Sequence, residues 1–295
     1  MIWKGVIPAI TTQFKEDMTV DHDAIAKHII WLVDSGCVGI LPLGSLGEGA
    51  TLTHDEKVAI LDTCVKTVGH RVPVVAGISA LSTDESIQLA KDAKRVGCQG
   101  LMVLPAYVYK GDWRETRANF DAVIKATDLS CMLYNNPIAY ATDVLPEQLA
   151  ELAEMNPNLH SVKESSADVR RVTAIKNLLG DRIAIFVGVD DLIVEAVPAG
   201  AVGWIAGLVN AFPVETVNLY NMCMEGRQAE AAELYKWFLP LLKLDVVPKF
   251  VQLIKLVQQE VGWGNERVRA PRMTIVGQER VDTLETLRIG LENRP

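Results

Sequence analysis

One lysine stands where a nucleophilic amine is chemically plausible. The run from Leu159 to Lys163 is typical of a buried strand, and the polar Glu164-Ser165-Ser166 after it is typical of a loop. Burial disfavours the charged ammonium form, so a neutral amine becomes available to attack a carbonyl or imine carbon. Most lysines near strand ends simply reach into solvent. Lys163 is therefore a candidate Schiff-base residue whose case depends on what lies beside it.

A tyrosine closes the strand that precedes this one in the chain. Tyr134 ends the apolar run 130–134, and neighbouring parallel strands end at the same edge of a sheet. Its phenol is then expected within reach of the Lys163 amine or of a bound carbonyl, where it can carry protons. The alternative is a core tyrosine whose hydroxyl is bound to the backbone. Together, Lys163 and Tyr134 predict imine chemistry assisted by proton transfer.

A short glycine-bounded turn supplies a place for an anion. Gly44-Ser45-Leu46-Gly47 follows an apolar run, and such a turn can direct successive backbone N–H groups at a carboxylate. The alternative is an ordinary connection between a strand and a helix. With the lysine and the tyrosine, the turn indicates a site for a 2-oxo acid. We expect Glu48 and Asp190 to support helix starts rather than act as catalytic acids.

These residues must be positioned by the elements around them. Apolar runs typical of buried strands alternate with amphipathic helical patterns, and the predicted strands are 5–10, 37–43, 72–78, 100–104, 130–134, 159–163, 183–187 and 201–206. Thr53 and Glu56 form a capping-box pattern, and Asp190 is predicted to cap the helix that ends near 199. Eight strands in this rhythm predict an α/β fold, a closed (β/α)8 TIM barrel.

The chemistry of such a barrel lies at the carboxyl ends of its strands. Besides the three groups above, these ends present Tyr107, Asn136, Gly188 and Ile205. Beyond the barrel, predicted over residues 1–225, helical patterns at 228–242, 248–261 and 281–291 predict a C-terminal helical extension, residues 226–295, packed on the barrel. Its surplus of apolar positions favours a subunit interface.

Composition narrows the class of protein. The net charge of −8 gives no basic footprint for nucleic acid or an anionic membrane, and no apolar run is long enough for a membrane span. The five cysteines are widely spaced in apolar surroundings, which indicates reduced packing residues, and the five histidines are too scattered for a metal site. We therefore expect a cytoplasmic enzyme that needs no metal and acts on a small molecule.

At these residues the chain resembles the dihydrodipicolinate synthase and N-acetylneuraminate lyase family of Schiff-base barrels over essentially its whole length. The resemblance rests on the runs Gly5-Val6-Ile7-Pro8-Ala9, Gly44 to Glu48, Tyr134-Asn135-Asn136-Pro137, the Lys163 strand, Gly188-Val189-Asp190-Asp191 and Gly203-Trp204-Ile205. It implies that Lys163 forms the Schiff base and that Tyr134 relays protons. It also implies no metal or organic cofactor and a homo-oligomer, commonly a tetramer.

The resemblance also assigns the surrounding residues. Ser45 would join Tyr134 to Tyr107 across a subunit contact, and the N–H groups of Ser45 and Leu46 would bind the substrate carboxylate. Asn136, Gly188 and Ile205 fall at the remaining substrate-binding positions. How Tyr109, Tyr140 and Trp204 shape the pocket is left open by the sequence.

Two departures from the family pattern bear on the substrate. The chain has Ser45-Leu46 where two threonines are usual, and Ile138-Ala139-Tyr140 where a synthase places an arginine for a second carboxylate. Loss of that bidentate partner argues against the condensation that gives a lysine precursor. The variant turn resembles the branch that deaminates 1-pyrroline-4-hydroxy-2-carboxylate in hydroxyproline degradation, giving 2-oxoglutarate semialdehyde and ammonia.

Other functions stay open at this point. Within the class they are a 2-keto-3-deoxy sugar-acid dehydratase or aldolase, an N-acetylneuraminate-type lyase and dihydrodipicolinate synthase itself. Outside it, the chain could be a catalytically silent barrel that binds a 2-oxo acid, or a metal-dependent aldolase. A silent binder has no use for both Lys163 and Tyr134, and no cluster of metal ligands supports the metal enzyme.

Overall fold

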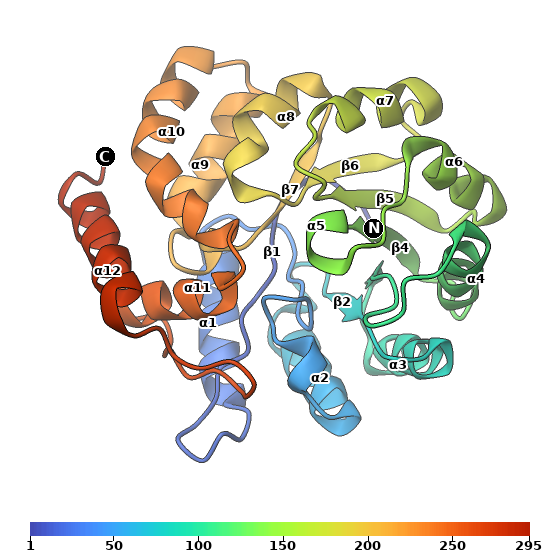
Figure 1. The fold of residues 1–295 in the computed structure, drawn as a ribbon, viewed down its shortest axis with the longest axis horizontal. Helices are drawn as coiled ribbons and strands as arrows, with labels where there is room; N and C mark the ends of the chain where they lie inside the picture. Colours follow the sequence, from blue (N-terminus) through green and yellow to red (C-terminus); the bar gives the residue numbers. More distant parts are fainter.

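The computed structural model describes all residues, 1–295, and shows seven parallel strands curled into a ring with helices outside it (Figure 1). Neighbouring strands follow the order β1-β7-β6-β5-β4-β3-β2. The strands are β1 (Gly5–Pro8), β2 (Val75–Ile78), β3 (Gly100–Val103), β4 (Ser130–Asn135), β5 (Leu159–Glu164), β6 (Ala184–Val187) and β7 (Gly203–Ala206). Almost all of their residues are buried, as expected for parallel strands enclosed by helices. The predicted α/β barrel is confirmed.

The second predicted strand, residues 37–43, is not a regular strand. The segment forms only isolated parallel bridges, from Leu41 to Ala9 on one side and from Ile40 to Val74 on the other. Pro42 has no N–H to continue the ladder, and Leu43 turns into the left-handed region at φ 68°. The segment still lies between β1 and β2 and closes the ring, so the eightfold rhythm holds with seven regular strands.

The outer helices follow the predicted alternation. They are α1 (His22–Asp34), α2 (His54–Val68), α3 (Thr83–Val96), α4 (Trp113–Ile124), α6 (Pro146–Met155), α7 (Arg170–Leu179), α8 (Ile193–Ala199) and α9 (Pro213–Met224). An additional short helix, α5 (Pro137–Tyr140), follows β4 and lies over the ring of strands rather than outside it (Figure 1). The capping box of Thr53 and Glu56 is confirmed at the start of α2. The predicted cap at Asp190 is wrong: α8 begins three residues later, because the Asp190 carboxyl turns inward to buried donors.

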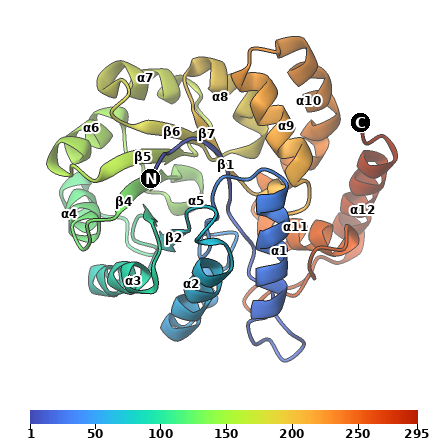
Figure 2. The ribbon, with the colours of Figure 1, turned by 180° about the vertical axis from the view of Figure 1, so that it is seen from behind.

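The C-terminal residues form α10 (Gln228–Leu242), a short 3-10 turn (Lys243–Asp245), α11 (Phe250–Glu260) and α12 (Gly277–Glu292). Both views show α12 at the outer margin of the molecule, beside α11 (Figures 1 and 2). In contrast, α11 packs against the segment that follows β1, where Gln258 accepts a hydrogen bond of 2.7 Å from the Thr11 hydroxyl. None of the helices combines the length and apolar character needed to cross a membrane.

Candidate active site

Strand register brings the predicted lysine and tyrosine together. In the β4–β5 ladder Tyr134 is paired with Lys163. Both side chains are buried, with Lys163 only 7% exposed. The lysine nitrogen lies 4.3 Å from the centre of the Tyr134 ring, and the Tyr134 hydroxyl accepts a hydrogen bond of 3.0 Å from the Asn136 amide. The amine therefore faces the ring of the phenol rather than its oxygen.

Gly188 makes room for this lysine. A Cβ at position 188 would lie 2.4 Å from Lys163 Cε and 2.1 Å from the Ser165 hydroxyl oxygen, so no larger residue fits without displacing the amine. The Ser165 oxygen is itself buried and has no hydrogen-bond partner. A buried polar atom without a partner is uncommon, and here it lies beside the candidate nucleophile. Gly188 thus shapes the floor around Lys163.

The predicted anion-binding turn adopts a tight backbone conformation. The N–H of Glu48 donates to the Ser45 carbonyl at 3.2 Å, and Glu48 itself lies in the left-handed region at φ 54°. The N–H groups of Ser45 and Leu46 donate to no backbone carbonyl. Leu46 is buried, which makes this side of the site more apolar than a threonine would. Two adjacent free N–H groups are what a carboxylate requires.

The hydroxyl of Ser45 contacts a tyrosine whose role the sequence left open. Ser45 is hydrogen-bonded to Tyr140, on the short helix α5. The Tyr140 ring lies edge-on to Tyr134, with centroids 5.8 Å apart, and 5.6 Å from Tyr107. Burial raises the pKa of Tyr107, and hydrogen bonds to Ser79 and Tyr140 oppose that rise. Tyr140 thus lies between Ser45 and Tyr107. The relay implied by the family resemblance did not include Tyr140 and joined Ser45 to Tyr107 directly.

The remaining pocket candidates divide into inner and outer residues. Ile205 and Trp204 are fully buried at the end of β7, and the Trp204 indole donates to Asp190 at 2.9 Å. Tyr109 is 61% exposed and donates to Glu115, so it lies outside the site. Burial raises the pKa of Asp190 to about 6, against its hydrogen bonds and the Lys163 charge.

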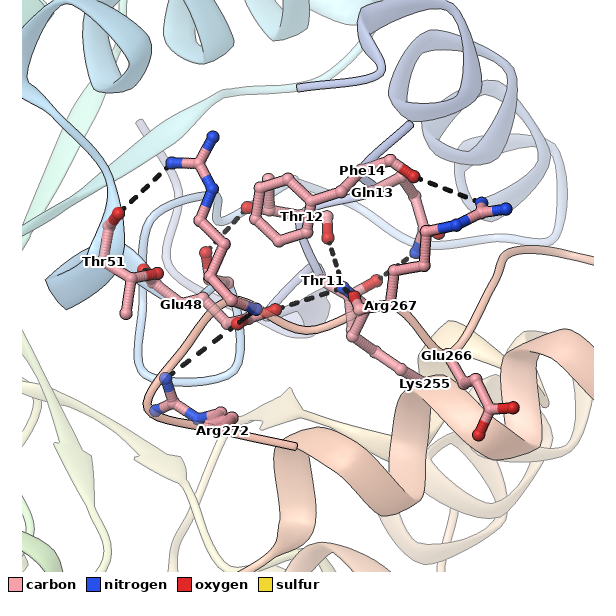
Figure 3. Close-up of polar contacts among 12 residues, drawn as sticks. Thr11, Thr12, Gln13, Phe14, Glu48, Thr51, Lys255, Glu266, Arg267 and Arg272 are labelled. Carbon is pink, nitrogen blue, oxygen red and sulfur yellow. Dashed lines mark hydrogen bonds and ion pairs between the residues drawn. The ribbon is translucent and has the colours of Figure 1, made fainter. Parts of the chain in front are cut away.

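The turn Gly44 to Glu48 is held by a buried ion pair between Glu48 and Lys255, which was not predicted from the sequence (Figure 3). Lys255 of α11 lies 3.1 Å from the Glu48 carboxylate and donates to the Thr12 carbonyl at 2.8 Å. Burial lowers the pKa of Lys255 to about 8, with Glu48 opposing. Arg272 approaches the other Glu48 oxygen at 4.0 Å. The available signal was a single lysine inside the apolar run of residues 253–257.

Neither a metal site nor the surface hollow at the opposite end of the barrel involves these residues. The structure has no group of three or more histidine, cysteine, aspartate or glutamate side chains placed to hold a metal ion. A surface hollow of about 730 Å³ is lined by Met1, Lys4 and Tyr220 among others, and lies at the amino ends of the strands. In barrels of this kind that end serves stability rather than chemistry. The candidate site is therefore the carboxyl-end group around Lys163.

The barrel holds a buried lysine at a strand end, with a tyrosine against it and free N–H groups nearby. This is the arrangement of class I enzymes, which form a lysine Schiff base. Residues 2–289 match the profile of the Dihydrodipicolinate synthetase family. The chain belongs to this family, and it is an enzyme of the family's class, the lysine Schiff-base lyases.

Individual relatives agree with this membership. The 4-hydroxy-tetrahydrodipicolinate synthase of Agrobacterium fabrum (strain C58) is 31% identical over 273 residues, which is 92% of this chain and 93% of that protein. The enzyme of the same name from Clostridium perfringens (strain 13) is 35% identical, over 81% and 82% of the two chains. The crystal structure of dihydrodipicolinate synthase from Aquifex aeolicus superposes with a TM-score of 0.93 at 28% identity, over 97% of each chain.

Proposed function

We propose that this enzyme deaminates 1-pyrroline-4-hydroxy-2-carboxylate, giving 2-oxoglutarate semialdehyde and ammonia. The observation that carries the proposal is the contrast between the two anion-binding positions. The free N–H groups of Ser45 and Leu46 offer a cradle for one carboxylate. The segment Ile138-Ala139-Tyr140 on α5, where the family resemblance implies an arginine for a second carboxylate in a synthase, contains no arginine. A substrate with a single carboxylate suits this site.

The chemistry begins at Lys163. Its amine attacks C2 of the cyclic imine, and the C2–N bond of the ring breaks, so that the lysine iminium replaces the ring imine and the ring opens. The iminium withdraws electrons from C3, and Tyr134 removes the C3 proton to give an enamine. The enamine expels the C4 hydroxyl as water, which leaves a C3–C4 double bond. Loss of a C5 proton followed by protonation at C3 and then C4 converts the C5 amine into an imine. Hydrolysis of the C5 imine releases ammonia, and hydrolysis of the C2 iminium releases the semialdehyde and Lys163.

Other residues assist this sequence. Ser45 and Tyr107 belong to the hydroxyl relay that returns protons to Tyr134, with Tyr140 between them. Asn136 holds the Tyr134 hydroxyl in place through its amide. Gly188 leaves space for the adduct beside Lys163, and Ile205 forms an apolar wall. All chemical steps are then carried by protein side chains and the substrate adduct.

A second candidate function comes from the relatives. Proteins at 30–35% identity are named 4-hydroxy-tetrahydrodipicolinate synthase, which favours condensation of pyruvate with a second substrate. The absence of an arginine from Ile138-Ala139-Tyr140 opposes it, since an unpaired second carboxylate loses a charge-assisted bidentate bond. Dehydration or aldol cleavage of a 2-keto-3-deoxy sugar acid, and cleavage of N-acetylneuraminate, use the same lysine and fit less well with the apolar Leu46.

We also propose that the chain works as a homo-oligomer, with a tetramer favoured. Three apolar side chains beside the site are exposed in the single chain: Val108, Tyr109 and Ile138. They flank Tyr107 and Tyr140, the outer members of the tyrosine cluster. Exposed apolar groups gathered beside an active site are typical of a surface that a second copy covers.

One set of assays separates these functions. Purified enzyme is offered the pyrroline, a 2-keto-3-deoxy sugar acid and N-acetylneuraminate. Release of ammonia or pyruvate is followed, together with consumption of the sugar acid, which also reports dehydration. Formation of 4-hydroxy-tetrahydrodipicolinate is measured separately. We expect ammonia from the pyrroline at a kcat/KM well above that for the other reactions. A faster synthase reaction would overturn the assignment, and no covalent mass after borohydride and pyruvate would favour a silent binder.

A further inference from the structure

Besides Asp190, the carboxyl of Asp245 lies close to the site, on the short turn after α10, and has no role in the mechanism proposed so far. Asp245 ends the short turn after α10, and its carboxyl lies against Gly207 at the end of β7. A Cβ at position 207 would lie 2.0 Å from Asp245 Oδ1 and 2.7 Å from Oδ2. The absence of a side chain at Gly207 is therefore what allows the carboxyl to enter.

The Asp245 carboxyl is buried without the partners that burial demands. The residue is partly exposed through its other atoms, but Oδ1 is buried and has no hydrogen-bond partner. Buried carboxyl oxygens normally accept hydrogen bonds, because desolvation without compensation costs free energy. An orphaned oxygen in an active site indicates that a bound molecule completes its bonding.

Asp190, the neighbour of Asp245, is fully satisfied. Its carboxylate accepts from the Trp204 indole at 2.9 Å, the Gly207 N–H at 3.1 and 3.2 Å, and the Leu208 N–H at 2.8 Å. The two carboxyls thus flank one glycine, and only Asp190 has donors to stabilise a negative charge. Two close carboxyls do not both ionise easily, so the one without donors keeps the proton.

The charges around Asp190 and Asp245 also favour the proton on Asp245. Burial, followed by the charge of Asp190, raises the pKa of Asp245 well above its usual value, and Lys163 opposes the rise. Lys163 also acts on Asp190. Both carboxyls are therefore close enough to the amine to be affected by its charge, and of the two Asp245 keeps its proton more readily.

We propose that Asp245 is the acid that protonates the hydroxyl leaving C4 of the substrate. The proposal rests on the Schiff-base function above and adds a residue to it. In the enamine on Lys163, the nitrogen lone pair re-forms the C2 iminium and the C2–C3 pair becomes a C3–C4 double bond. The C4–O bond breaks, its electron pair takes the Asp245 proton, and water leaves. Lys163, released later as an ammonium ion, returns a proton to the Asp245 carboxylate.

The test is the mass of the adduct that Asp245→Asn accumulates. The variant keeps a polar group of the same size and removes the acid. Wild type and variant are mixed with the pyrroline in a single turnover, and borohydride traps the species on Lys163 at successive times. We expect the variant to accumulate an adduct that retains the hydroxyl, with loss of water slowed about 10²-fold or more. Trapping of pyruvate, which has no hydroxyl to lose, should be as fast as in wild type.

A second variant displaces the carboxyl without changing its chemistry. Gly207→Ala puts a methyl group where Asp245 Oδ1 lies, and the same dehydration defect is expected. Asp168→Asn changes a partly exposed carboxylate paired with Arg170; it is the matched control and should dehydrate normally. Loss of water at the wild-type rate in Asp245→Asn overturns the proposal, as does an equal loss of pyruvate trapping, which would show a structural role.

The outcome is separable from failure of the proposed substrate. If wild-type enzyme traps pyruvate but does not convert the pyrroline, the deaminase assignment fails. The same trapping series is then run with 2-keto-3-deoxygluconate, a 2-oxo acid that also carries a hydroxyl on C4. A hydroxyl-retaining adduct in Asp245→Asn supports the acid role there too, and wild-type dehydration in the variant refutes it.

Discussion

The Lys163 nitrogen lies over the face of the Tyr134 ring, 4.3 Å from its centre, and the two residues are paired in register across β4 and β5. The register fixes the height of both side chains at the same edge of the barrel. The ring shields the amine from water, while Asn136 holds the Tyr134 hydroxyl in place. The aromatic ring and the hydroxyl of Tyr134 therefore have separate duties, and a substitution can remove one without the other.

Tyr134→Phe is expected to lower kcat by about 10²-fold or more, the usual contribution of a positioned acid-base group. The ring remains, so covalent trapping of pyruvate on Lys163 by borohydride should persist at a reduced rate. Lys163→Ala should lose both turnover and trapping. Steady-state kinetics and intact-protein mass spectrometry give the two readouts. An unchanged kcat in Tyr134→Phe would remove the hydroxyl from the mechanism.

The Ser45–Tyr140 contact predicts that these two hydroxyls act as one unit. Tyr140→Phe and Ser45→Ala should each lower kcat by about tenfold or more, and the double variant should lose little beyond the larger single effect, because coupled residues are not additive. The control is Tyr109→Phe, whose hydroxyl binds Glu115 at the surface and should leave kcat unchanged. Fully additive losses would show that Ser45 and Tyr140 act separately.

The parts of the site that the sequence predicted are those set by local pattern and strand order. A lysine and a tyrosine at the ends of successive predicted strands had to lie close together once the sheet was parallel. The glycine-bounded turn carried its own backbone signal. Lys163, Tyr134 and Ser45 are therefore recognisable from the sequence without their contacts.

What the sequence did not predict are contacts between residues far apart in the chain. Ser45 and Tyr140 are 95 positions apart, and Glu48 and Lys255 are 207 apart, so no local periodicity joins either pair. Asp190 has the local pattern of a helix cap, but three buried donors outcompeted the helix end. Nothing in the sequence distinguishes Gly207 from other glycines. Its role is visible only in the structure, where the Asp245 carboxyl occupies the space that a side chain at position 207 would need.

The buried Glu48–Lys255 pair should be costly to break on one side. Lys255→Met removes the nearer cation of the buried Glu48 carboxylate and leaves only Arg272 at 4.0 Å, and we expect a loss of about 3–5 kcal/mol in the free energy of unfolding. Urea denaturation measures it. The turn that Glu48 closes should loosen as well, raising KM for the substrate.

Two further variants test whether the loss of stability in Lys255→Met comes from the unpaired buried charge. Glu48→Gln combined with Lys255→Met removes both charges and should recover part of the stability, since the unpaired charge is gone. Lys236→Met breaks an exposed pair with Glu233 and should change stability little. A Lys255→Met variant as stable as wild type would mean that the buried pair contributes no net stabilisation.

His28 should make stability depend on pH. It is 2% exposed, and its Nε2 lies 2.9 Å from the Asn210 carbonyl, which fixes the neutral ring as donor. Burial lowers its pKa from 6.5 to about 4, although the Asn210 bond opposes the shift. Between these values the unfolded chain binds a proton that the folded chain does not. The contribution of the neutral ring is thus complete above pH 6.5 and is lost as the pH falls toward 4.

The measurement must separate His28 from Asp190, which titrates in the opposite sense. The pKa of Asp190 is raised to about 6, so its effect on stability becomes less favourable as the pH rises from 3.8 to 6. Urea midpoints of wild type and His28→Gln are therefore compared at pH 7.5 and 4.5. We expect wild type to lose roughly 2.5 kcal/mol more than the variant over this range, from the shift in the His28 pKa. Because both proteins keep Asp190, its contribution cancels, and parallel pH profiles would show that His28 does not titrate as its burial requires.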